Sequence, residues 1–393
     1  MDKKNKNPNV PNLRFPQFIE PWNNYIVSEL LTTFPTNSLS WDQLVENQDS
    51  SLKNLHYGLI HNGFETTCIT GENQLFPYIK HSFIPTKYAL IQNGDLILAD
   101  ASEDRKDVGK PVEMLDIGNQ KIVSGLHTIH ARNKTDLIVN GFKGFYFQSS
   151  AMKQQIFKIA NGSKIYGISS SAFNELKMFI PEKQEQKKII DLMIKIEERI
   201  QTQSKIIKDL KIQKAKIRQT EILNVSTNRI LVLNQLCNIK TGKKDANQMK
   251  SNGTYKFFTC SREDYYIDTY SFEGDSLIIS GNGEIGLIKY YSGKFDAYQR
   301  TYVLQNFECD PLYLKLVLEE KLPKIINKEK NVGAMPYIVL STLSNITIPL
   351  PDLQTQTKIQ INIGVLDKKI KIESQLLNKF EIQKKFLLNN MFI

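Results

Sequence analysis

The sequence predicts a mixed α/β (α+β) protein in which two strand-rich globular domains are separated by two long helices that form an antiparallel coiled coil. Three observations indicate this architecture and the internal pseudo-two-fold repeat it implies. One segment recurs 170 residues further along the chain, both copies carry a heptad stripe of apolar residues, and the stretches between them contain short strands that end in turn residues.

The repeated segment begins at a proline. Residues 179–189 read FIPEKQEQKKI and residues 349–359 read PLPDLQTQTKI, so Pro181 corresponds to Pro351. A proline followed by an acidic residue is typical of the first turn of a helix, because the proline needs no hydrogen bond there and the negative charge interacts favourably with the helix dipole. Both copies therefore predict a helix start.

Each copy continues with apolar residues at alternating steps of three and four, and even the two polar members of the stripe coincide. The members are Ile189, Met193, Ile196, Ile200, Gln203, Ile207, Leu210, Lys214 and Ile217, and then Ile359, Ile363, Leu366, Ile370, Glu373, Leu377, Phe380, Lys384 and Leu387. A lone stripe of this kind is more often ordinary helix-bundle packing. Two matching stripes in one chain favour helices that pair with each other.

These patterns divide the chain into four parts. We predict a first globular domain at 1–180 with a polar tail at 1–12, a first helix at 181–226, a second globular domain at 227–350 and a second helix at 351–393. The globular domains start alike, since residues 26–30 resemble residues 232–236 at a spacing of 206. Because the later spacing is 170, the second globular domain is 36 residues shorter.

Short strand signals fill both globular domains. Apolar runs such as residues 96–98 and 276–279 stand next to the turn residues Asn93–Gly94 and Gly274–Asp275. Helical signals are few, and residues 311–318 give the clearest one. We therefore expect each globular domain to be a strand-rich α/β unit.

Composition excludes several classes of protein. The 393 residues are 41% hydrophobic and 23% charged, as in ordinary globular proteins. No apolar run approaches the roughly 18 residues of a membrane span, and the polar start of the chain lacks the apolar core of a signal peptide. We expect a cytoplasmic protein without a membrane partner.

The four cysteines show no metal-site or disulfide spacing. No C-x-x-C pair or neighbouring histidine pair is present, so we expect reduced and mostly buried thiols and no metal ligands. The cysteines are Cys68, Cys237, Cys260 and Cys309.

The net charge of +10 suggests a polyanionic partner. Its distribution matters more than its sum, because residues 182–224 contribute +4 and residues 352–393 contribute +3. The globular domains are therefore nearly neutral, and phosphate attraction alone would hold the chain to DNA only modestly.

Aromatic and basic residues are interleaved on predicted loops. In the first domain they are His56, Tyr57, His61, Arg105, Lys106, His127, His130 and Arg132, and in the second Lys243, Lys244, Arg262, Tyr265, Tyr266, Gln299, Arg300 and Tyr302. Such side chains can read base edges, stack or hold phosphates, although each alone is more often a solvated surface group. As DNA-binding candidates we select Tyr57, His61, Arg105, Lys106, His127, Lys243, Lys244, Arg262, Gln299 and Arg300.

The sequence contains no motif in a context that favours catalysis. Residues 281–286 match G-x-G-x-x-G after an apolar strand, but a β-type run follows in place of the helix that would bind a pyrophosphate, so a glycine-rich turn is favoured. A Walker P-loop and an amino-methyltransferase tetrapeptide are absent from the sequence. The acidic pairs Glu103–Asp104 and Glu263–Asp264 stand beside basic residues, which favours solvated or DNA-facing loops over a nuclease metal site. We expect no catalytic residue and no metal site.

The chain resembles the specificity subunit of type I restriction-modification systems over nearly its whole length. The helix starts P-x-x-Q-x-Q-x-x-I at 181–189 and 351–359, and the closing residues 387–392, are similar to the family's two repeated regions. Residues 36–40, 56–61, 99–104 and 125–128 resemble one target-recognition type, and residues 293–302 resemble another. Thr355 replaces the acidic residue usual at its position, and Gly364 is unexpected in a spacer helix.

The resemblance implies a non-catalytic subunit that recognises double-stranded DNA. Each domain would read half of a split site in the major groove, and the helices would set the half-site spacing. Two methyltransferase subunits would dock on the helices through Gln184, Gln186, Ile189, Gln354, Gln356 and Ile359, and two restriction/translocase subunits would join them. S-adenosylmethionine, ATP and Mg²⁺ would be bound by those partners and not by this chain.

Other functions stay open from the sequence. The chain could serve a methyltransferase-only complex without a restriction subunit, or act as a coiled-coil adaptor that binds no DNA. A stand-alone methyltransferase or nuclease is disfavoured by the missing motifs.

Overall fold

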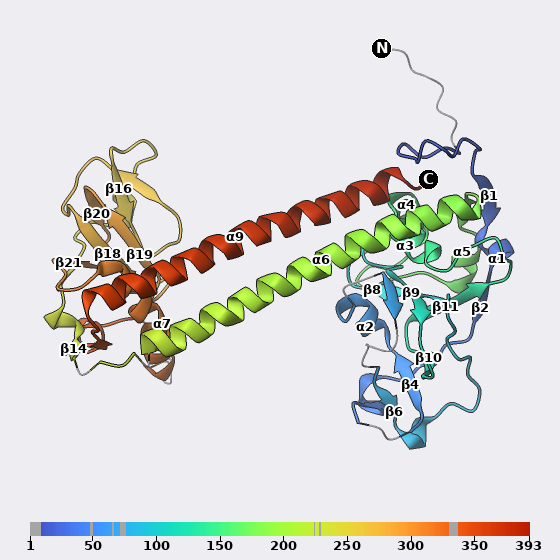
Figure 1. Ribbon diagram of the computed structural model, residues 1–393, viewed down its shortest axis with the longest axis horizontal. Helices are drawn as coiled ribbons and strands as arrows, with labels where there is room; N and C mark the ends of the chain where they lie inside the picture. The colour runs from blue at the N-terminus through green and yellow to red at the C-terminus, as the bar shows by residue number, and fades with distance from the viewer. Residues whose placement is uncertain are drawn as a thin grey trace, which may run out of the picture. The chain divides into compact units, whose positions relative to one another are not determined.

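The computed structural model describes residues 9–47, 50–64, 67–70, 76–223, 225–227, 229–329 and 337–393. Most of the predicted polar tail at 1–12 and the side chain of Cys68 lie outside the described parts. The chain divides into two compact units (Figure 1): unit 1 contains residues 1–204 and 375–393, and unit 2 contains residues 205–374. We call the strand-rich part of unit 1 head 1 and that of unit 2 head 2.

Head 1 contains two main sheets. The five-stranded sheet has the order β2 (Leu31–Phe34), β11 (Thr128–Asn133), β7 (Leu96–Ala99), β9 (Pro111–Asp116) and β5 (Cys68–Thr70). The four-stranded sheet has the order β10 (Lys121–Ser124), β4 (Leu52–Leu55), β6 (Tyr78–Ile79) and β3 (Leu44–Val45), and its β10–β4 pair is parallel. Two small antiparallel pairs join β1 (Asn23–Ile26) to β13 (Lys177–Ile180) and β8 (Ala101–Ser102) to β12 (Tyr166–Gly167). The helices are α1 (Val27–Leu30), α2 (Tyr57–Asn62), α3 (Phe142–Gln148), α4 (Ser150–Ile159) and α5 (Ser170–Asn174).

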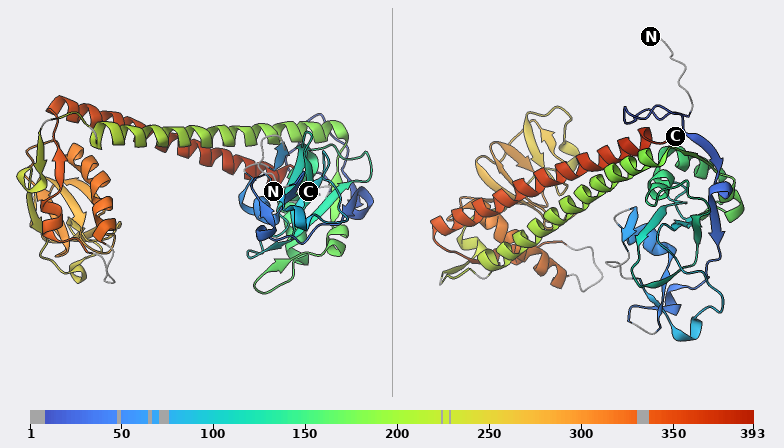
Figure 2. Two further views of the ribbon diagram at one scale, coloured as in Figure 1. Left: turned by 90° about the horizontal axis from the view of Figure 1, so that it is seen from below. Right: turned by 45° about the vertical axis from the view of Figure 1, so that its right-hand side comes forward.

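Head 2, drawn in two further views in Figure 2, repeats this plan, and its described part contains fewer strands than that of head 1. Its four-stranded sheet has the order β15 (Asn238–Thr241), β21 (Thr301–Gln305), β18 (Asp275–Ser280) and β19 (Ile288–Ser292). A three-stranded sheet has the order β17 (Tyr265–Ile267), β16 (Tyr255–Phe258) and β20 (Phe295–Ala297), and its β16–β20 pair is parallel, as β4–β10 is in head 1. The remaining elements are the pair β14 (Ile230–Val232) and β22 (Thr347–Pro349), and the helices α7 (Pro311–Glu329) and α8 (Leu340–Ser344).

Two long helices carry the repeated stripes. They are α6 (Lys183–Ile217), which continues into a π-helical turn at Arg218–Leu223, and α9 (Leu353–Asn390). In unit 1 Lys384 of α9 forms an ion pair with Glu197 of α6 at 2.6 Å, and in unit 2 Lys214 of α6 pairs with Asp367 of α9. Glu197 comes before Lys214 along α6, whereas its partner Lys384 comes after Asp367 along α9. The two helices are therefore antiparallel. The predicted mixed fold class with paired long helices is confirmed.

The main core of unit 1 brings aromatic side chains of α3 against the long helices. Phe142, Tyr146 and Phe147 are fully buried, and they share a cluster with Met193 of α6 and Phe392 beyond α9. The equivalent cluster of unit 2 joins α7 to Ile359 and Ile363 of α9. Burying a large apolar side chain stabilises the folded state by about 2 kcal/mol. These clusters therefore fix each head to the long helices.

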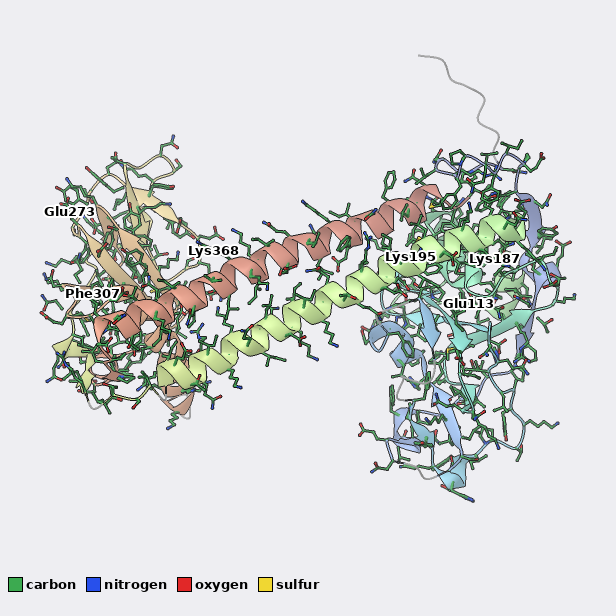
Figure 3. All side chains as sticks on the ribbon, in the orientation of Figure 1. Glu113, Lys187, Lys195, Glu273, Phe307 and Lys368 are labelled. Atoms are coloured by element: carbon green, nitrogen blue, oxygen red, sulfur yellow. The ribbon has the colours of Figure 1, made fainter. Side chains whose placement is uncertain are left out.

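A buried ion pair also lies within head 1. Glu113 of β9, labelled in Figure 3, pairs with Lys143 of α3 at 2.9 Å, and neither side chain is exposed. The Glu113 carboxylate also accepts hydrogen bonds from the backbone N–H groups of Gly141 and Gly144, both at 2.7 Å. These bonds fix the start of α3 against the sheet.

Several finer predictions can be compared with the structure. The helix signal at 311–318 is confirmed by α7, and residues 281–286 form a turn followed by strand β19, as expected. Of the described cysteine side chains Cys237 is buried, whereas Cys260 and Cys309 are only partly buried, so the expectation of mostly buried thiols is wrong for these two. Among the described residues no helix is both long and apolar enough to cross a membrane. The predicted domain boundaries stay a prediction.

Candidate nucleic-acid interface

In head 1 three loops converge, following β4, following β7 and joining β10 to β11. The backbone N–H of Gly125 donates to the carbonyl of Leu55 at 2.9 Å, and the N–H of Asp100 donates to the carbonyl of His127 at 3.0 Å. We call this group of loops, with the side chains that pack on it, loop cluster 1.

Head 2 builds the same junction from unrelated residues. The N–H of Tyr298 donates to the carbonyl of Phe258 at 2.9 Å, and the N–H of Gly281 donates to the carbonyl of Arg300 at 3.0 Å. These residues lie where the loops that follow β16 and β18 meet the loop that joins β20 to β21. We call this meeting point, together with the loop after β15 that bonds to it, loop cluster 2. The matching bonds place His127 and Arg300 at equivalent positions of the two heads.

Loop cluster 1 is dominated by rings. Trp41, His56, Tyr57 and His127 form a continuous column with centroid separations of 4.5, 4.6 and 5.3 Å, and His61 lies edge-on to Tyr57 at 6.0 Å. About half of the surface of Trp41 (49%) and of the His127 side chain (49%) is exposed, so both ends of the column are open to solvent.

The middle of the column is fixed by His56. Burial, and then the neighbouring His127, lower the pKa of His56 to about 4, so this ring is neutral at physiological pH. Its Nδ1 accepts a hydrogen bond from the N–H of Gly58 at 3.1 Å. His56 thus caps α2 and holds Tyr57 in place rather than facing a ligand.

His127 adopts an unusual backbone conformation for a residue with a side chain. Its φ is +53°, in the left-handed region, which costs on the order of 1 kcal/mol for a non-glycine residue. Its Nδ1 lies 3.3 Å from Oδ1 of Asp100. Burial raises the pKa of Asp100, and the contact with His127 opposes that rise. The backbone and the carboxylate together fix where this imidazole lies.

Loop cluster 2 carries basic side chains where loop cluster 1 carries aromatic rings. The Lys244 N–H donates to the carbonyl of Ala297 at 3.3 Å and its own carbonyl accepts from the Gln299 N–H at 3.0 Å, which brings residues 243–244 beside Arg300. A cavity of about 280 Å³ beside them is lined by Thr241, Gly281, Asn282, Gln299, Arg300, Tyr302, Tyr337, Ile338, Val339 and Leu340. The Cys260 thiol donates to the Arg300 carbonyl at 3.3 Å, so Arg262, two residues further on, lies near the same loops.

The structure therefore brings together seven of the ten predicted DNA-binding residues in two groups. Tyr57, His61 and His127 belong to loop cluster 1, and Lys243, Lys244, Gln299 and Arg300 belong to loop cluster 2. Arg262 lies at the border of loop cluster 2, where it pairs with Glu284 at 3.0 Å. DNA contact by any of them stays a prediction.

Two predicted residues lie elsewhere. Arg105 stacks on Phe157 at 4.2 Å and donates to the carbonyls of Phe157 and Ala160 at 3.0 and 3.2 Å, so it ties β8's loop to α4. Lys106 is exposed beside it. Arg105 and Lys106 do not belong to loop cluster 1, and DNA contact by either residue stays a prediction.

Five of the residues predicted to lie on loops lie on strands, and Tyr57 and His61 lie on helix α2. Tyr265 and Tyr266 are on β17. His130 and Arg132 are on β11, where they bind the buried Asp95 at 2.6 and 2.8 Å, and Tyr302 on β21 donates to the Ile338 carbonyl at 2.8 Å. Their assignment to loops was wrong, because residue type alone does not show that a polar side chain has a buried partner.

Sequence reasoning missed Trp41, Asp100 and Asn282 as members of the clusters. Trp41 stands 15 residues before His56 with no spacing pattern between them. An aromatic residue next to the Thr36–Ser40 string was the available signal. Within the described parts of the chain no three His, Cys, Asp or Glu side chains lie close enough to hold a metal ion.

The predicted subunit-binding residues divide by exposure. Gln184 and Gln354 are exposed, whereas Ile189 and Ile359 are buried on the long helices. Gln186 and Gln356 are buried too, and we call them the repeated glutamines. Contact of any of these residues with a partner subunit stays a prediction.

The repeated glutamines fix the helix starts to the heads. The Gln186 amide accepts from the Val139 N–H at 2.8 Å and donates to the carbonyls of Pro181 and Leu137 at 2.9 and 2.8 Å. The Gln356 amide accepts from the Asp310 N–H at 3.0 Å and donates to the Pro351 carbonyl at 2.8 Å. The repeated sequence thus codes for a repeated structural junction.

This duplicated plan matches one sequence family. The family described as the type I restriction modification DNA specificity domain matches residues 77–211 and 227–381. The chain belongs to this family.

Individual relatives of the specificity family agree. The chain is 34% identical over 134 residues to the type I restriction enzyme EcoDI specificity subunit of Escherichia coli, a match that covers 34% of this chain and spans only 30% of that relative's length. It is 22% identical over 364 residues to the type I restriction enzyme MjaVIII specificity subunit of Methanocaldococcus jannaschii, covering 80% of this chain and 84% of the relative.

The fold is shared with a solved specificity subunit. The crystal structure of the type I restriction-modification system S subunit from M. genitalium matches with a TM-score of 0.61 at 15% identity, covering 98% of this chain and 99% of the other. At this identity the likeness establishes the fold, which is the mixed helix and strand architecture expected from the sequence.

Proposed function

We propose that the chain is the DNA-sequence recognition subunit of a type I restriction-modification complex. Each head reads one half of a bipartite site in the major groove. The observation that carries the proposal is the pair of loop clusters, which share their backbone hydrogen bonds and differ in nearly every side chain. A common frame with different side chains is suited to reading two different DNA sequences.

The side chains of loop cluster 2 suit base edges. An arginine can donate two hydrogen bonds to O6 and N7 of guanine, and a glutamine can pair with N6 and N7 of adenine. Arg300 and Gln299 are neighbours in one exposed loop, with Lys243 beside them for phosphate contact. Loop cluster 1 offers an imidazole and two large rings instead, which suits apolar contact and single hydrogen bonds.

The long helices have two roles in this proposal. They set the spacing between the half-sites, and they dock two methyltransferase subunits near the repeated helix starts, where Gln184 and Gln354 are exposed. Specificity subunits of this family work in complexes with other subunits and DNA, and two restriction/translocase subunits complete the assembly we propose.

Chemistry belongs to the partners in this proposal. The methyltransferase subunits bind S-adenosylmethionine, and the restriction subunits use ATP and Mg²⁺, while this chain contributes recognition in the cytoplasm. The nearly neutral heads gain DNA affinity from partners that enclose the duplex.

Genome-wide methylation mapping tests the proposal. The chain is expressed with its methyltransferase subunit in a host without adenine modification, and methylated adenines are located by single-molecule sequencing. We expect one split motif with a fixed gap of unread bases. A continuous motif, or methylation without sequence preference, would contradict the two-head reading.

A further inference from the structure

The two loop clusters differ in kind at one equivalent pair of positions. Head 2 has Arg300 on one loop and Gly281 on the next, joined by the hydrogen bond from the Gly281 N–H to the Arg300 carbonyl. Head 1 has His127 and Asp100 at these positions, joined by the same backbone bond. A permanent cation beside a glycine is thus replaced by a titratable imidazole in contact with a carboxylate.

We propose that the Asp100–His127 pair determines a base preference of head 1 and makes that preference depend on pH. The inference rests on the proposed function and concerns how one half of the site is read. His127 is the specificity-determining residue, and Asp100 is a positioning residue that acts through it.

The chemistry follows from the hydrogen-bonding capacity of the two groups. An ionised carboxylate can only accept, so the proton of neutral His127 resides on Nδ1, 3.3 Å from Asp100, and Nε2 is left as an acceptor. An acceptor suits the amino groups of adenine N6 or cytosine N4. Protonation converts Nε2 into a donor, which suits guanine O6 and N7 or thymine O4. One proton therefore reverses the polarity that head 1 presents.

The surroundings allow this change of charge. Among the described residues, Asp100 at the end of β7 is the charged group in contact with His127, and the Tyr57 ring of α2 stands edge-on at 5.3 Å. His56, the residue that caps α2, stacks on the other side of the column at Tyr57 and is neutral, since its pKa is about 4. His61 lies beyond Tyr57, with Nε2 3.0 Å from the Ala101 carbonyl. The imidazole is half exposed, so protons and DNA can both reach it.

The backbone supports a fixed rather than an adaptable reader. His127 holds a φ of +53°, and its carbonyl accepts from the Asp100 N–H at 3.0 Å. Strain of this kind persists where the surrounding structure specifies it, and it is common at binding sites. The same loop supplies both the ring and the hydrogen bond that anchors it to Asp100.

Base preference at two pH values tests the inference. The chain in complex with its methyltransferase subunit binds duplexes of the mapped site in which each position of each half is varied in turn, at about pH 6 and about pH 8. We expect the preference at one position of the head 1 half to shift by about fivefold, from adenine or cytosine at the higher pH toward guanine or thymine at the lower. The head 2 half should not change, because arginine stays charged throughout.

Three variants separate this effect from a structural role. Asp100→Asn supplies an amide that can either donate to Nδ1 or accept from it, so it no longer selects one tautomer, and the variant should show a weaker preference for adenine or cytosine at about pH 8. His127→Gln cannot titrate and should show no dependence on pH. Arg300→His should transfer pH dependence to the head 2 half. Thermal melting of each variant confirms that the complex stays folded.

The outcomes are distinct. A shift confined to the head 1 half that His127→Gln abolishes would support the inference. A mapped split site whose preferences are the same at both pH values, or a shift that persists in His127→Gln, would overturn the inference and leave the proposed function standing. Absence of any split motif would overturn the proposed function and this inference with it.

Discussion

Loop cluster 1 and loop cluster 2 have the same backbone junction and opposite chemistry. Both join three loops through the same two hydrogen bonds, at 2.9 and 3.0 Å in each head. One displays Trp41, Tyr57 and His127, and the other displays Lys243, Gln299 and Arg300. The frame of each head and its surface chemistry are therefore specified by different residues, so the surface can vary while the frame stays the same.

The helix junctions show the opposite behaviour. Gln186 and Gln356, 170 residues apart, each donate to the carbonyl of the proline five residues before them, and the head starts match as well. The N–H of Ile26 donates to Glu29 at 2.8 Å, and that of Val232 donates to Gln235 at 3.1 Å. Where the two halves must have the same geometry, the residues themselves repeat.

The largest effect we expect comes from breaking a structural contact of head 1. Glu113→Gln leaves Lys143 buried without a countercharge and should destabilise unit 1 by about 3–5 kcal/mol, because an unpaired buried charge is costly. Calorimetry should show an earlier transition for unit 1 with that of unit 2 unchanged. Lys183→Ala is the control, since the exposed pair with Asp136 should contribute only about 0–1 kcal/mol. Equal effects of the two variants would contradict the assigned role of Glu113.

A smaller effect is expected at the repeated glutamines. Gln186→Leu and Gln356→Leu each leave buried backbone groups without partners, which should cost about 1–3 kcal/mol. The loss should be larger for Gln186, which bonds two carbonyls where Gln356 bonds one. Denaturant unfolding measures the loss of stability in each variant. A larger loss for Gln356→Leu than for Gln186→Leu would contradict this prediction.

The exposed neighbours provide matched controls. Gln184→Leu and Gln354→Leu should change stability by less than about 0.5 kcal/mol, as most surface substitutions do. If either variant folds normally but binds the methyltransferase subunit more weakly, the loss of affinity indicates that the substituted glutamine contacts that subunit. Unchanged binding by both variants would remove these two residues from the predicted docking surface.

A small stabilising effect distinguishes the two long helices. Gly364 of α9 stands where α6 has Ile194, and a Cβ at Gly364 would meet no atom within 4 Å. Gly364→Ala should therefore stabilise the protein by about 0.5–1 kcal/mol through the higher helix propensity of alanine. A loss of stability in thermal melting would show that glycine is needed at this position.

The sequence predicted the repeat and the helices because their signals are local or periodic. Pro181 and Pro351 indicate the helix starts, and the heptad stripes can be recognised from the local sequence without information on distant contacts. The loop clusters could not be predicted as units, since Tyr57, Asp100 and His127 meet only after two sheets have formed. For the same reason Arg105 looked like a surface reader, although it stacks on Phe157 more than 50 residues away.

Mapping the motifs of two single variants tests whether the two loop clusters read DNA independently. Methylation motifs are mapped for Arg300→Ala and for His127→Ala, each expressed with the methyltransferase subunit. We predict that Arg300→Ala costs about 1–3 kcal/mol of binding and relaxes bases in one half of the split motif only, while His127→Ala relaxes bases in the other half only. If both variants relax the same half, or if neither changes the motif, the assignment of one half-site to each head is contradicted.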